Sequence, residues 1–221
     1  MRIAIVGPGR IGGNCARRFA QAGHDVVVTF ARDRGRLEAL AAEIGGEVAE
    51  PAEAVAGADV VVLSVPWGVI PEALEQAGSL AGKIVIDTTN QYGDGGVLEL
   101  PDGQTAAQFN AARLPGARYT KSFNTLNSAI QVETADRAGD ERVVQWVCGD
   151  DEEAKSLVSR LIEEAGYVPV DLGGTAEGAV MEPPGRPGAV YGEEYRAADA
   201  AAVVEAVRAG SEIPPAPKYE T

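Results

Sequence analysis

The chain has 221 residues, of which 45% are hydrophobic and 24% charged, which is enough to build the core of one large domain. Its net charge of −14 at pH 7 disfavours a nucleic-acid partner, because an acidic surface repels phosphate. No run of residues approaches the ~20 apolar residues of a membrane span, and the first strand starts directly after Arg2. We therefore expect a cytoplasmic protein with no signal peptide and no membrane partner.

Runs of valine and isoleucine alternate with segments rich in alanine, glutamate and leucine. This alternation is typical of buried parallel strands joined by helices, so it predicts an α/β fold with a doubly wound, mostly parallel sheet. The predicted strands are Ile3–Val6, Asp25–Phe30, Ala58–Val65, Lys83–Asp87, Ala117–Phe123, Arg142–Cys148 and Tyr167–Asp171. The predicted helices cover about 10–22, 34–44, 68–78, 124–131, 151–165 and 193–209.

After Asp171 the strand and helix pattern gives way to a segment rich in glycine and proline, which is typical of a long loop. The last predicted helix follows, and then the tail EIPPAPKYET, which we expect to be extended or disordered. The pattern predicts one nucleotide-binding domain over 1–180 and a C-terminal part over 181–221 that consists of a loop, a helix and a flexible tail.

The first strand runs into the glycine-rich sequence GPGRIG, which matches G-x-G-x-x-G. The motif follows a strand and opens a helix, which is the context that a Rossmann dinucleotide site requires. Gly7 makes the tight turn, Gly9 lets backbone approach a diphosphate, and Gly12 lets the helix pack on the strand. The diphosphate would lie at the helix N-terminus, which favours anions. The predicted cofactor-binding residues of this turn are Gly7, Pro8, Gly9, Arg10, Ile11 and Gly12.

The end of the second strand indicates which dinucleotide is bound. An NAD site usually carries an acidic residue there, which binds the ribose 2′-hydroxyl. This chain reads TFA at the strand end, and three arginines follow at positions 32, 34 and 36. A guanidinium binds a 2′-phosphate that a carboxylate would repel, so the cluster, with Arg32 and Arg36, favours NADP.

Three further strand ends carry small polar or aromatic groups, in LSVPW, DTTNQYG and KSFNTLN. Ligands of doubly wound sheets lie beyond the carboxyl ends of the strands, so we expect these segments to form one crevice. The polar residues that would hydrogen-bond a nicotinamide or its reaction partner are Ser64, Thr88, Asn90 and Asn124. Pro66 and Trp67 would supply a flat apolar wall.

The residues offer no clear acid–base catalyst. The one histidine, His24, lies in the turn after the first helix, so no Ser-His-Asp arrangement can form. Lys121 enters a strand, a position more typical of a structural lysine than of a proton donor. Cys15 and Cys148 have neither metal-ligand nor disulfide spacing. We therefore assign no catalytic residue and no metal site.

Several segments together resemble a known family. GPGRIG, the arginine-rich second turn, SVPW, KIVIDTTN, KSFNT, VCGDDEEAK and GYVPVDLG occur in the same order in the NADPH-dependent coenzyme F420 reductases. The pattern is also similar to the cytoplasmic NADPH domain of the six-transmembrane metalloreductases. The resemblance covers about residues 1–180. From Met181 onward the sequence departs from the apolar helical end that forms the deazaflavin pocket of archaeal members.

The resemblance implies hydride transfer between NADP(H) and a flavin-like carrier, with coenzyme F420 as the small-molecule co-substrate. It implies a diphosphate on the glycine-rich turn, and a 2′-phosphate on Thr29 and Arg32. It also implies that the nicotinamide and the acceptor lie along Ser64, Val65, Pro66, Trp67, Asn90 and Asn124. An acceptor of this kind brings its own redox chemistry, so the protein mainly has to align two rings.

Two other functions stay open at this point. One is an NADPH-dependent reductase that acts on a flavin, a quinone or a small carbonyl or imine compound. The other is a non-catalytic binding module that senses NADP and docks a partner. Proteins of this architecture often complete their sites by dimerising, so the predicted helix at 193–209 is a candidate homodimer interface.

Overall fold

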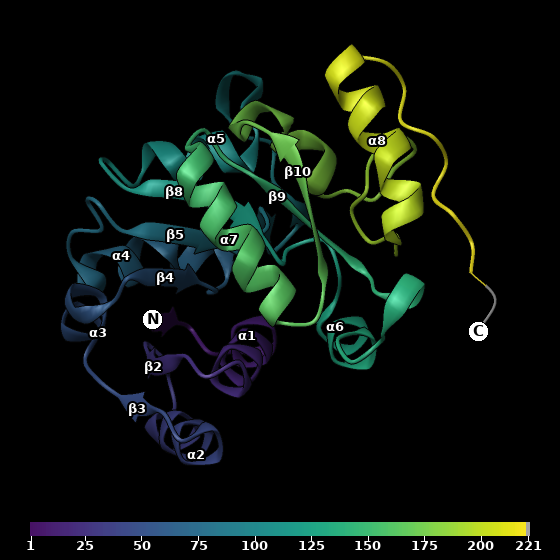
Figure 1. Cartoon of the computed structure of the whole chain (residues 1–221). Coiled ribbons are helices and arrows are strands. Elements are labelled where there is room, and N and C mark those ends of the chain that lie inside the picture. The colour runs from purple at the N-terminus through teal and green to yellow at the C-terminus, as the bar shows by residue number, and fades with distance from the viewer. Residues whose placement is uncertain (220–221) are drawn as a thin grey trace.

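The fold is built around one sheet of eight strands. The computed structural model describes residues 1–219 and confirms the predicted α/β class, with helices packed on both faces of the sheet (Figure 1). The order across the sheet is β10-β9-β8-β5-β4-β1-β2-β3. The strand bounds are β1 Arg2–Val6, β2 Asp25–Thr29, β3 Glu47–Val48, β4 Val60–Leu63, β5 Ile84–Asp87, β8 Arg118–Ser122, β9 Val144–Cys148 and β10 Val168–Gly173. The short strands β6 Tyr92–Gly93 and β7 Gly96–Val97 form a separate hairpin.

Strand direction reverses at one place in the sheet. All neighbouring pairs from β3 across to β8 are parallel, whereas β8 and β9 are antiparallel, with Lys121 opposite Cys148. β10 is parallel to β9 and therefore shares the reversed direction. The expectation of a mostly parallel sheet is confirmed. As a consequence, the carboxyl ends of β1, β2, β4, β5 and β8 all lie along the same edge.

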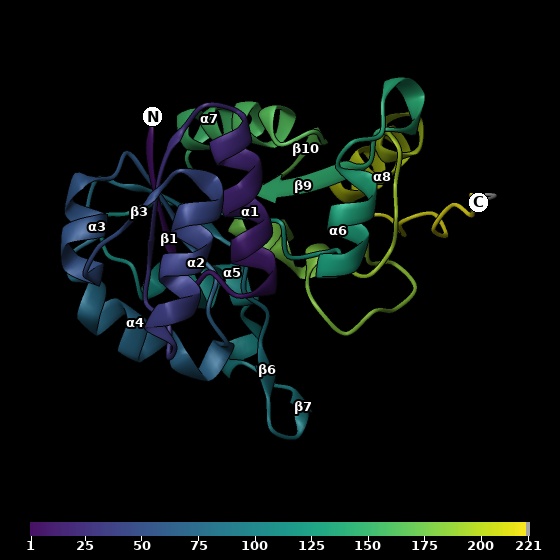
Figure 2. The same cartoon turned by 90° about the horizontal axis from the view of Figure 1, so that it is seen from below.

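Helices cover the two faces of the sheet as two separate layers (Figures 1 and 2). The core on one face contains Cys15 and Phe19 of α1 together with apolar residues of α2 and α7. The core on the other face takes its residues from α3, α4, α5 and α8. The helix bounds are α1 Arg10–Gln21, α2 Arg34–Ile44, α3 Pro51–Gly57, α4 Ile70–Ala77, α5 Ala106–Ala112, α6 Ser128–Thr134, α7 Glu152–Glu164 and α8 Ala197–Ala209. Short 3₁₀ segments cover η1 Trp67–Val69, η2 Pro101–Gly103, η3 Gly139–Glu141 and η4 Thr175–Met181.

Two predicted helices begin later than expected, and two helices are additional. The helix expected at 193–209 begins at Ala197. The expected helix at 124–131 begins only at Ser128, because Asn127 is its N-cap and accepts hydrogen bonds from the N–H groups of Ala129 and Ile130. The residues before Asn127 therefore stay in a loop at the end of β8. Helices α3 and α5 lie in segments where no helix was predicted.

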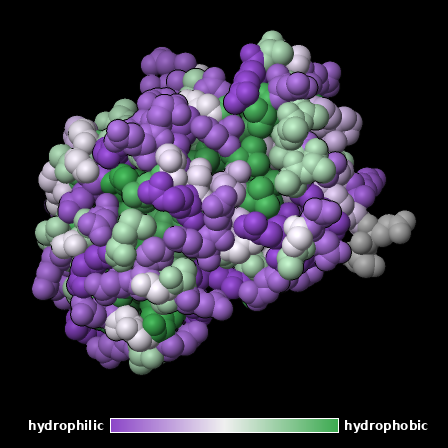
Figure 3. Space-filling model, in the orientation of Figure 1, coloured by the Kyte–Doolittle hydropathy of each residue, from purple (hydrophilic) through white to green (hydrophobic). Residues whose placement is uncertain are grey.

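The C-terminal segment packs against the domain. After η4, a loop leads into α8, and the chain then runs without helix or strand as far as residue 219. Ile213 is buried, and the Tyr219 hydroxyl donates to Asp199 Oδ2 at 2.7 Å. The last two residues of the predicted tail lie outside the described residues. Over 1–219, no helix is both long and apolar enough to cross a membrane. The face seen in Figure 3 is mostly hydrophilic, in line with the net charge.

Candidate active site

The glycine-rich turn joins β1 to α1. At two of its three motif glycines a side chain would collide with neighbouring atoms, and at the third it would enter open space. Gly7 has a φ of +87°, and a Cβ on it would lie 2.5 Å from Val65 Cγ1. A Cβ on Gly12 would lie 2.5 Å from the Gly7 carbonyl oxygen, so glycine is needed there for α1 to pack on β1. A Cβ on Gly9 would meet no atom within 4 Å. Gly9 therefore faces open space at the N-terminus of α1, where the first helical N–H groups lack intrahelical partners.

Two cavities border this turn. The first, which we call the β2–β4 cavity, has a volume of about 420 Å³ and lies between Gly7–Gly9, the segment after β2 and Ser64–Pro66 after β4. The second, which we call the β5–β8 crevice, has a volume of about 270 Å³ and is lined by Arg10, Ile11 and residues that follow β5 and β8. The turn lines both cavities, so a ligand extended across Gly9 would reach from one to the other.

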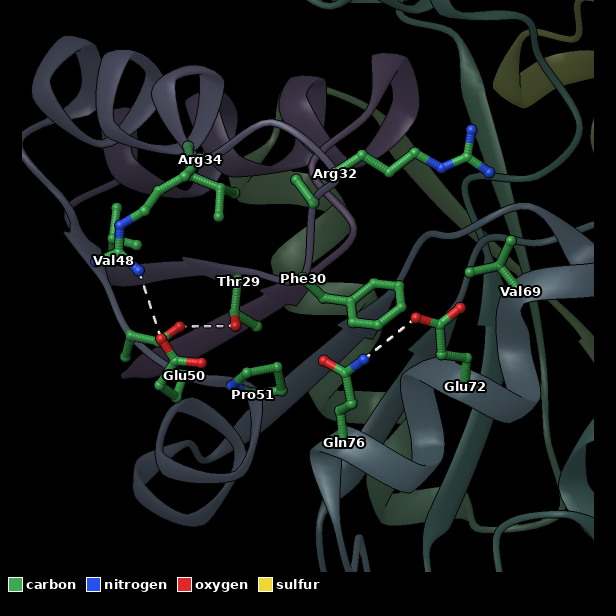
Figure 4. Close-up of a pocket in the computed structure, with 13 residues that line it drawn as sticks. Thr29, Phe30, Arg32, Arg34, Val48, Glu50, Pro51, Val69, Glu72 and Gln76 are labelled. Carbon is green, nitrogen blue, oxygen red and sulfur yellow. Dashed lines mark hydrogen bonds and ion pairs between the residues drawn. The ribbon is translucent and has the colours of Figure 1, made fainter.

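Three arginines follow β2, and they differ in how they are paired. Arg34 Nε lies 3.1 Å from Glu38 Oε1, and Arg36 Nε lies 3.6 Å from Asp33 Oδ2. Arg32 has no hydrogen bond or ion pair from its side chain to any other residue within 1–219, and it lines the β2–β4 cavity. Figure 4 shows Arg32 and Arg34 pointing in opposite directions. Arg32 and Arg36 both line the β2–β4 cavity, and Arg32 is the one of the two without an ion pair to another residue within 1–219, so its guanidinium is the more available to an anion.

Two predicted residues hold buried positions. The Thr29 hydroxyl donates to the Ala49 carbonyl oxygen at 2.7 Å, and its side chain is fully buried at the end of β2 (Figure 4). Trp67 lines neither the β2–β4 cavity nor the β5–β8 crevice. Its ring is stacked on Phe109, with the two ring centroids 6.0 Å apart. The predicted roles of Thr29 at the 2′-phosphate and of Trp67 as a wall stay predictions.

The β5–β8 crevice brings the two predicted asparagines together. Asn90 Nδ2 donates to the Asn124 carbonyl oxygen at 2.9 Å, and Asn124 Nδ2 donates to Asn90 Oδ1 at 3.0 Å and to the Met181 carbonyl oxygen at 2.7 Å. Asn124 Oδ1 and Thr125 Oγ1 are buried, and neither has a hydrogen-bond partner among the described residues. Buried polar atoms are normally paired, so these two mark a place where a ligand would complete the hydrogen bonding.

Ser64 connects the two cavities. It lines the β2–β4 cavity, and its Oγ accepts a hydrogen bond of 2.9 Å from Thr88 Oγ1, which belongs to the β5–β8 crevice. The predicted neighbours Val65 and Pro66 also line the β2–β4 cavity. The structure therefore brings Ser64, Thr88 and the two asparagines close together, as the sequence predicted for these strand-end segments.

Two phenylalanines border these cavities with unusual backbone conformations. Phe30, at the end of β2, has a φ of 57°, and Phe123, at the end of β8, has a φ of 58°. A bulky side chain in this left-handed region costs of order 1–3 kcal/mol, and such strain clusters at functional sites. Phe30 lines both the β2–β4 cavity and a neighbouring one of about 240 Å³, shown in Figure 4, whereas Phe123 lines the β5–β8 crevice.

A buried polar network, which the sequence did not reveal, lies beneath the crevice. Asp87 and Lys121 are both fully buried, with Lys121 Nζ 3.8 Å from Asp87 Oδ2 and donating to the Thr89 carbonyl oxygen at 2.6 Å. Asp87 Oδ2 also accepts hydrogen bonds from the Tyr119 hydroxyl at 2.6 Å and from Asn110 Nδ2 at 2.8 Å. Burial, reinforced by Asp87, raises the pKa of Tyr119 well above its ordinary value. These contacts assign Lys121 a structural role, as its position in the sequence indicated.

The fold and the two cavities at a glycine-rich turn define a dinucleotide-binding protein of the Rossmann class. Comparison with known proteins agrees and confirms the resemblance noted from the sequence. Residues 2–91 match the family of coenzyme F420-dependent NADP oxidoreductases. Metalloreductase STEAP3 of Rattus norvegicus is 29% identical over 181 residues, which cover 82% of this chain and 36% of the rat protein. The chain thus spans about a third of the length of the curated relatives it matches.

Solved structures show the same relationship. A hypothetical protein from Sinorhizobium meliloti is 29% identical, with a TM-score of 0.77 over 89% of this chain and 95% of that one. A candidate F420-dependent NADP-reductase from an Arthrobacter species is 29% identical, with a TM-score of 0.70 over 81% of this chain and 88% of that one. A reductive aminase from Aspergillus terreus, at 22% identity and a TM-score of 0.59 over 80% of this chain and 56% of that one, shares the fold. These matches support the class of NADP-dependent oxidoreductases.

Proposed function

We propose that this chain transfers a hydride between NADP(H) and the deazaflavin coenzyme F420. The observation that carries the proposal is the meeting of the two cavities at the glycine-rich turn. Gly7–Gly9 line the β2–β4 cavity and Arg10–Ile11 line the β5–β8 crevice, so a dinucleotide laid over the turn would reach both. The family match and the Arthrobacter structure support F420 as the second substrate.

The residues of both cavities fit the parts of NADP(H). The open space at Gly9 suits a diphosphate, which would accept hydrogen bonds from the first N–H groups of α1. The free guanidinium of Arg32 suits the 2′-phosphate. The unpaired, buried Asn124 Oδ1 suits an amide N–H donor, such as the carboxamide of the nicotinamide.

Hydride transfer between the nicotinamide and the deazaflavin requires the protein mainly to align the two rings. When NADPH is the donor, the hydride carries two electrons from the reduced nicotinamide to the acceptor. The acceptor also takes up one proton from water. A carbonyl or imine substrate would instead need a positioned acid. Tyr191 lines the crevice, and burial together with its hydrogen bond to Tyr92 raises the pKa of Tyr191. An acceptor with its own redox chemistry needs no such acid, and we infer that the acceptor is of this kind.

The test is a titration of the purified chain with NADPH, followed by addition of coenzyme F420 while the deazaflavin absorbance is recorded. We expect saturable NADPH binding and then bleaching of F420 at many turnovers per protein molecule. Gly9→Val is the matched negative variant. Its side chain enters space that is free of protein atoms, so it should fold normally, yet it should bind no NADPH and bleach no F420.

Parallel reactions with a flavin, a quinone and a cyclic imine separate the other enzymatic functions. NADPH oxidation with one of these and none with F420 would overturn the proposed acceptor. NADPH binding without turnover of any acceptor would leave the binding module as the better description. A folded Gly9→Val variant that still binds NADPH would show that the turn does not hold the diphosphate.

A further inference from the structure

An exposed apolar hairpin stands beside the β5–β8 crevice. Five large hydrophobic residues are exposed over residues 1–219, and three of them lie in this hairpin. Tyr92 is 46% exposed, Val97 37% and Leu98 41%, whereas Met1 and Val132 stand alone elsewhere in the sequence. Figure 2 shows the hairpin of β6 and β7 projecting from the body of the molecule. Clustered exposed apolar side chains usually mark a binding surface.

The hairpin is joined to the crevice by both chain and contacts. It begins directly after Gln91, two residues after Asn90, and the Leu98 N–H closes it by donating to the Gln91 carbonyl oxygen at 2.8 Å. The Tyr92 hydroxyl lies 3.0 Å from the hydroxyl of Tyr191, which lines the crevice. Tyr92 therefore connects the exposed hairpin to the wall of the crevice.

The crevice is small for what the proposed reaction requires. Cavities that enclose a drug-sized ligand have volumes of about 300–1,000 Å³. The β5–β8 crevice has about 270 Å³, and the nicotinamide end of the dinucleotide would share that space. A second ring system stacked on the nicotinamide would therefore extend past the mouth of the crevice. The hairpin lies beside the crevice, where Tyr92 meets Tyr191.

The charge of the hairpin limits which part of an acceptor it can bind. Residues 91–98 contain no cation, and Asp94 is the one charged residue among them. This surface would not attract a phosphate or carboxylate, because the carboxylate of Asp94 and the net charge of −14 both repel anions. Exposed apolar side chains instead suit the flat, uncharged face of a conjugated ring.

We propose that Tyr92, Val97 and Leu98 form a platform that holds the planar ring of the hydride acceptor at the mouth of the crevice. The inference rests on the proposed function. A second copy of the chain fits this surface less well. In a two-fold interface the same patch faces itself, which would bring Asp94 and Glu99 of two acidic molecules together. A hairpin of this length is also small beside the ~800 Å² per partner of stable interfaces.

The test compares a double substitution in the hairpin with a single control substitution of the same kind in α6. Val97→Ser with Leu98→Ser removes the apolar side chains of the platform, and Val132→Ser makes the same change at an exposed position of α6. The affinity for F420 is measured by fluorescence titration with NADP⁺ present, so that no reaction occurs, and the affinity for NADPH is measured separately. We expect about tenfold weaker F420 binding in the hairpin variant, with unchanged NADPH binding. The Val132→Ser variant should match the wild type in both.

Equal F420 affinity in the two variants would overturn the platform. So would a wild-type dimer, detected by sedimentation, that the hairpin substitutions dissociate, because the surface would then belong to a second copy. Failure of the proposed function gives a different result. If the wild type reduces a flavin or a quinone and not F420, the same comparison with that compound still tests the platform. If it reduces no planar acceptor, both the function and the platform are wrong.

Discussion

At the scale of single residues, selectivity for NADP depends on which arginine is free. Arg34 and Arg36 are paired with acidic neighbours, whereas Arg32 has no such partner among the described residues. We expect Arg32→Glu to weaken NADPH binding about 10- to 100-fold, because it removes charge-assisted hydrogen bonds of about 1.5–3 kcal/mol. NADH, which lacks the 2′-phosphate, should lose far less. Titration of both cofactors by fluorescence measures the difference.

Arg34→Glu is the control for this prediction, since it makes the same change in charge two residues away. Equal losses for NADPH and NADH in Arg32→Glu would contradict the assignment, as would a larger NADPH-specific loss in Arg36→Glu. The arginine cluster was visible in the sequence, and so was its meaning for NADP. Which member is free was not, because that depends on the acidic side chains that α2 and the segment before α3 bring alongside.

At the scale of elements, the Asp87–Lys121 pair ties β5 to β8 and fixes the loop that carries Asn90. Lys121→Met would leave the Asp87 carboxylate buried beside its remaining donors, which are Asn110, Tyr119 and the Thr89 N–H. We expect this variant to lower the free energy of unfolding by about 3 kcal/mol, the order found when a buried pair loses one partner. Urea unfolding followed by circular dichroism measures the loss.

Lys155→Met is the comparison for this prediction. The Lys155 side chain is also buried, but its partners Asp171 and Glu152 are 41% and 83% exposed, so water would solvate them after the substitution. We expect a loss of about 1 kcal/mol or less there. Similar losses in the two variants would mean that burial of the partner carboxylate does not decide the energy.

The helices and strands were predictable where apolar residues recur at helical spacing or where valine and isoleucine form a continuous run. The seven predicted strands and the helices near α1, α2, α4 and α7 are all present. Helix α5 was missed although Thr105 and Gln108 form a capping box that marks its start. The reversal at β9 could not be predicted, because single strands with continuous apolar runs carry no signal of their direction. The position of the two cavities beside the glycine-rich turn could not be predicted either, because it depends on packing between segments that are distant in the sequence.

At the scale of the whole molecule, ion pairs between different elements hold the layers in place. Arg17 of α1 pairs with Glu43 of α2, Arg18 of α1 with Asp136 beyond α6, and Arg118 of β8 with Asp151 before α7. Each arginine lowers the pKa of its partner carboxylate in the folded state. For Asp151 the chief cause is the hydrogen bonding from Arg118.

Because these carboxylate pKa values are lowered in the folded state, the ion pairs contribute less to the stability of the protein as the pH falls. A carboxylate whose folded-state pKa is depressed stabilises the protein above its ordinary pKa, which is 3.8 for Asp136 and Asp151 and 4.5 for Glu43, and the contribution disappears as the pH falls below those values. We therefore expect the urea midpoint of the wild type to fall as the pH is lowered from 5 toward 3.

Arg118→Met lets the Asp151 pKa return toward 3.8, so the variant should be less stable at pH 7 and should lose less stability on acidification. Protonation also reduces the repulsion that comes with a net charge of −14, but this effect acts almost equally on both proteins, and the difference between their two curves removes it. Parallel curves from pH 7 to pH 3 would show that the Arg118–Asp151 pair does not couple folding to protonation.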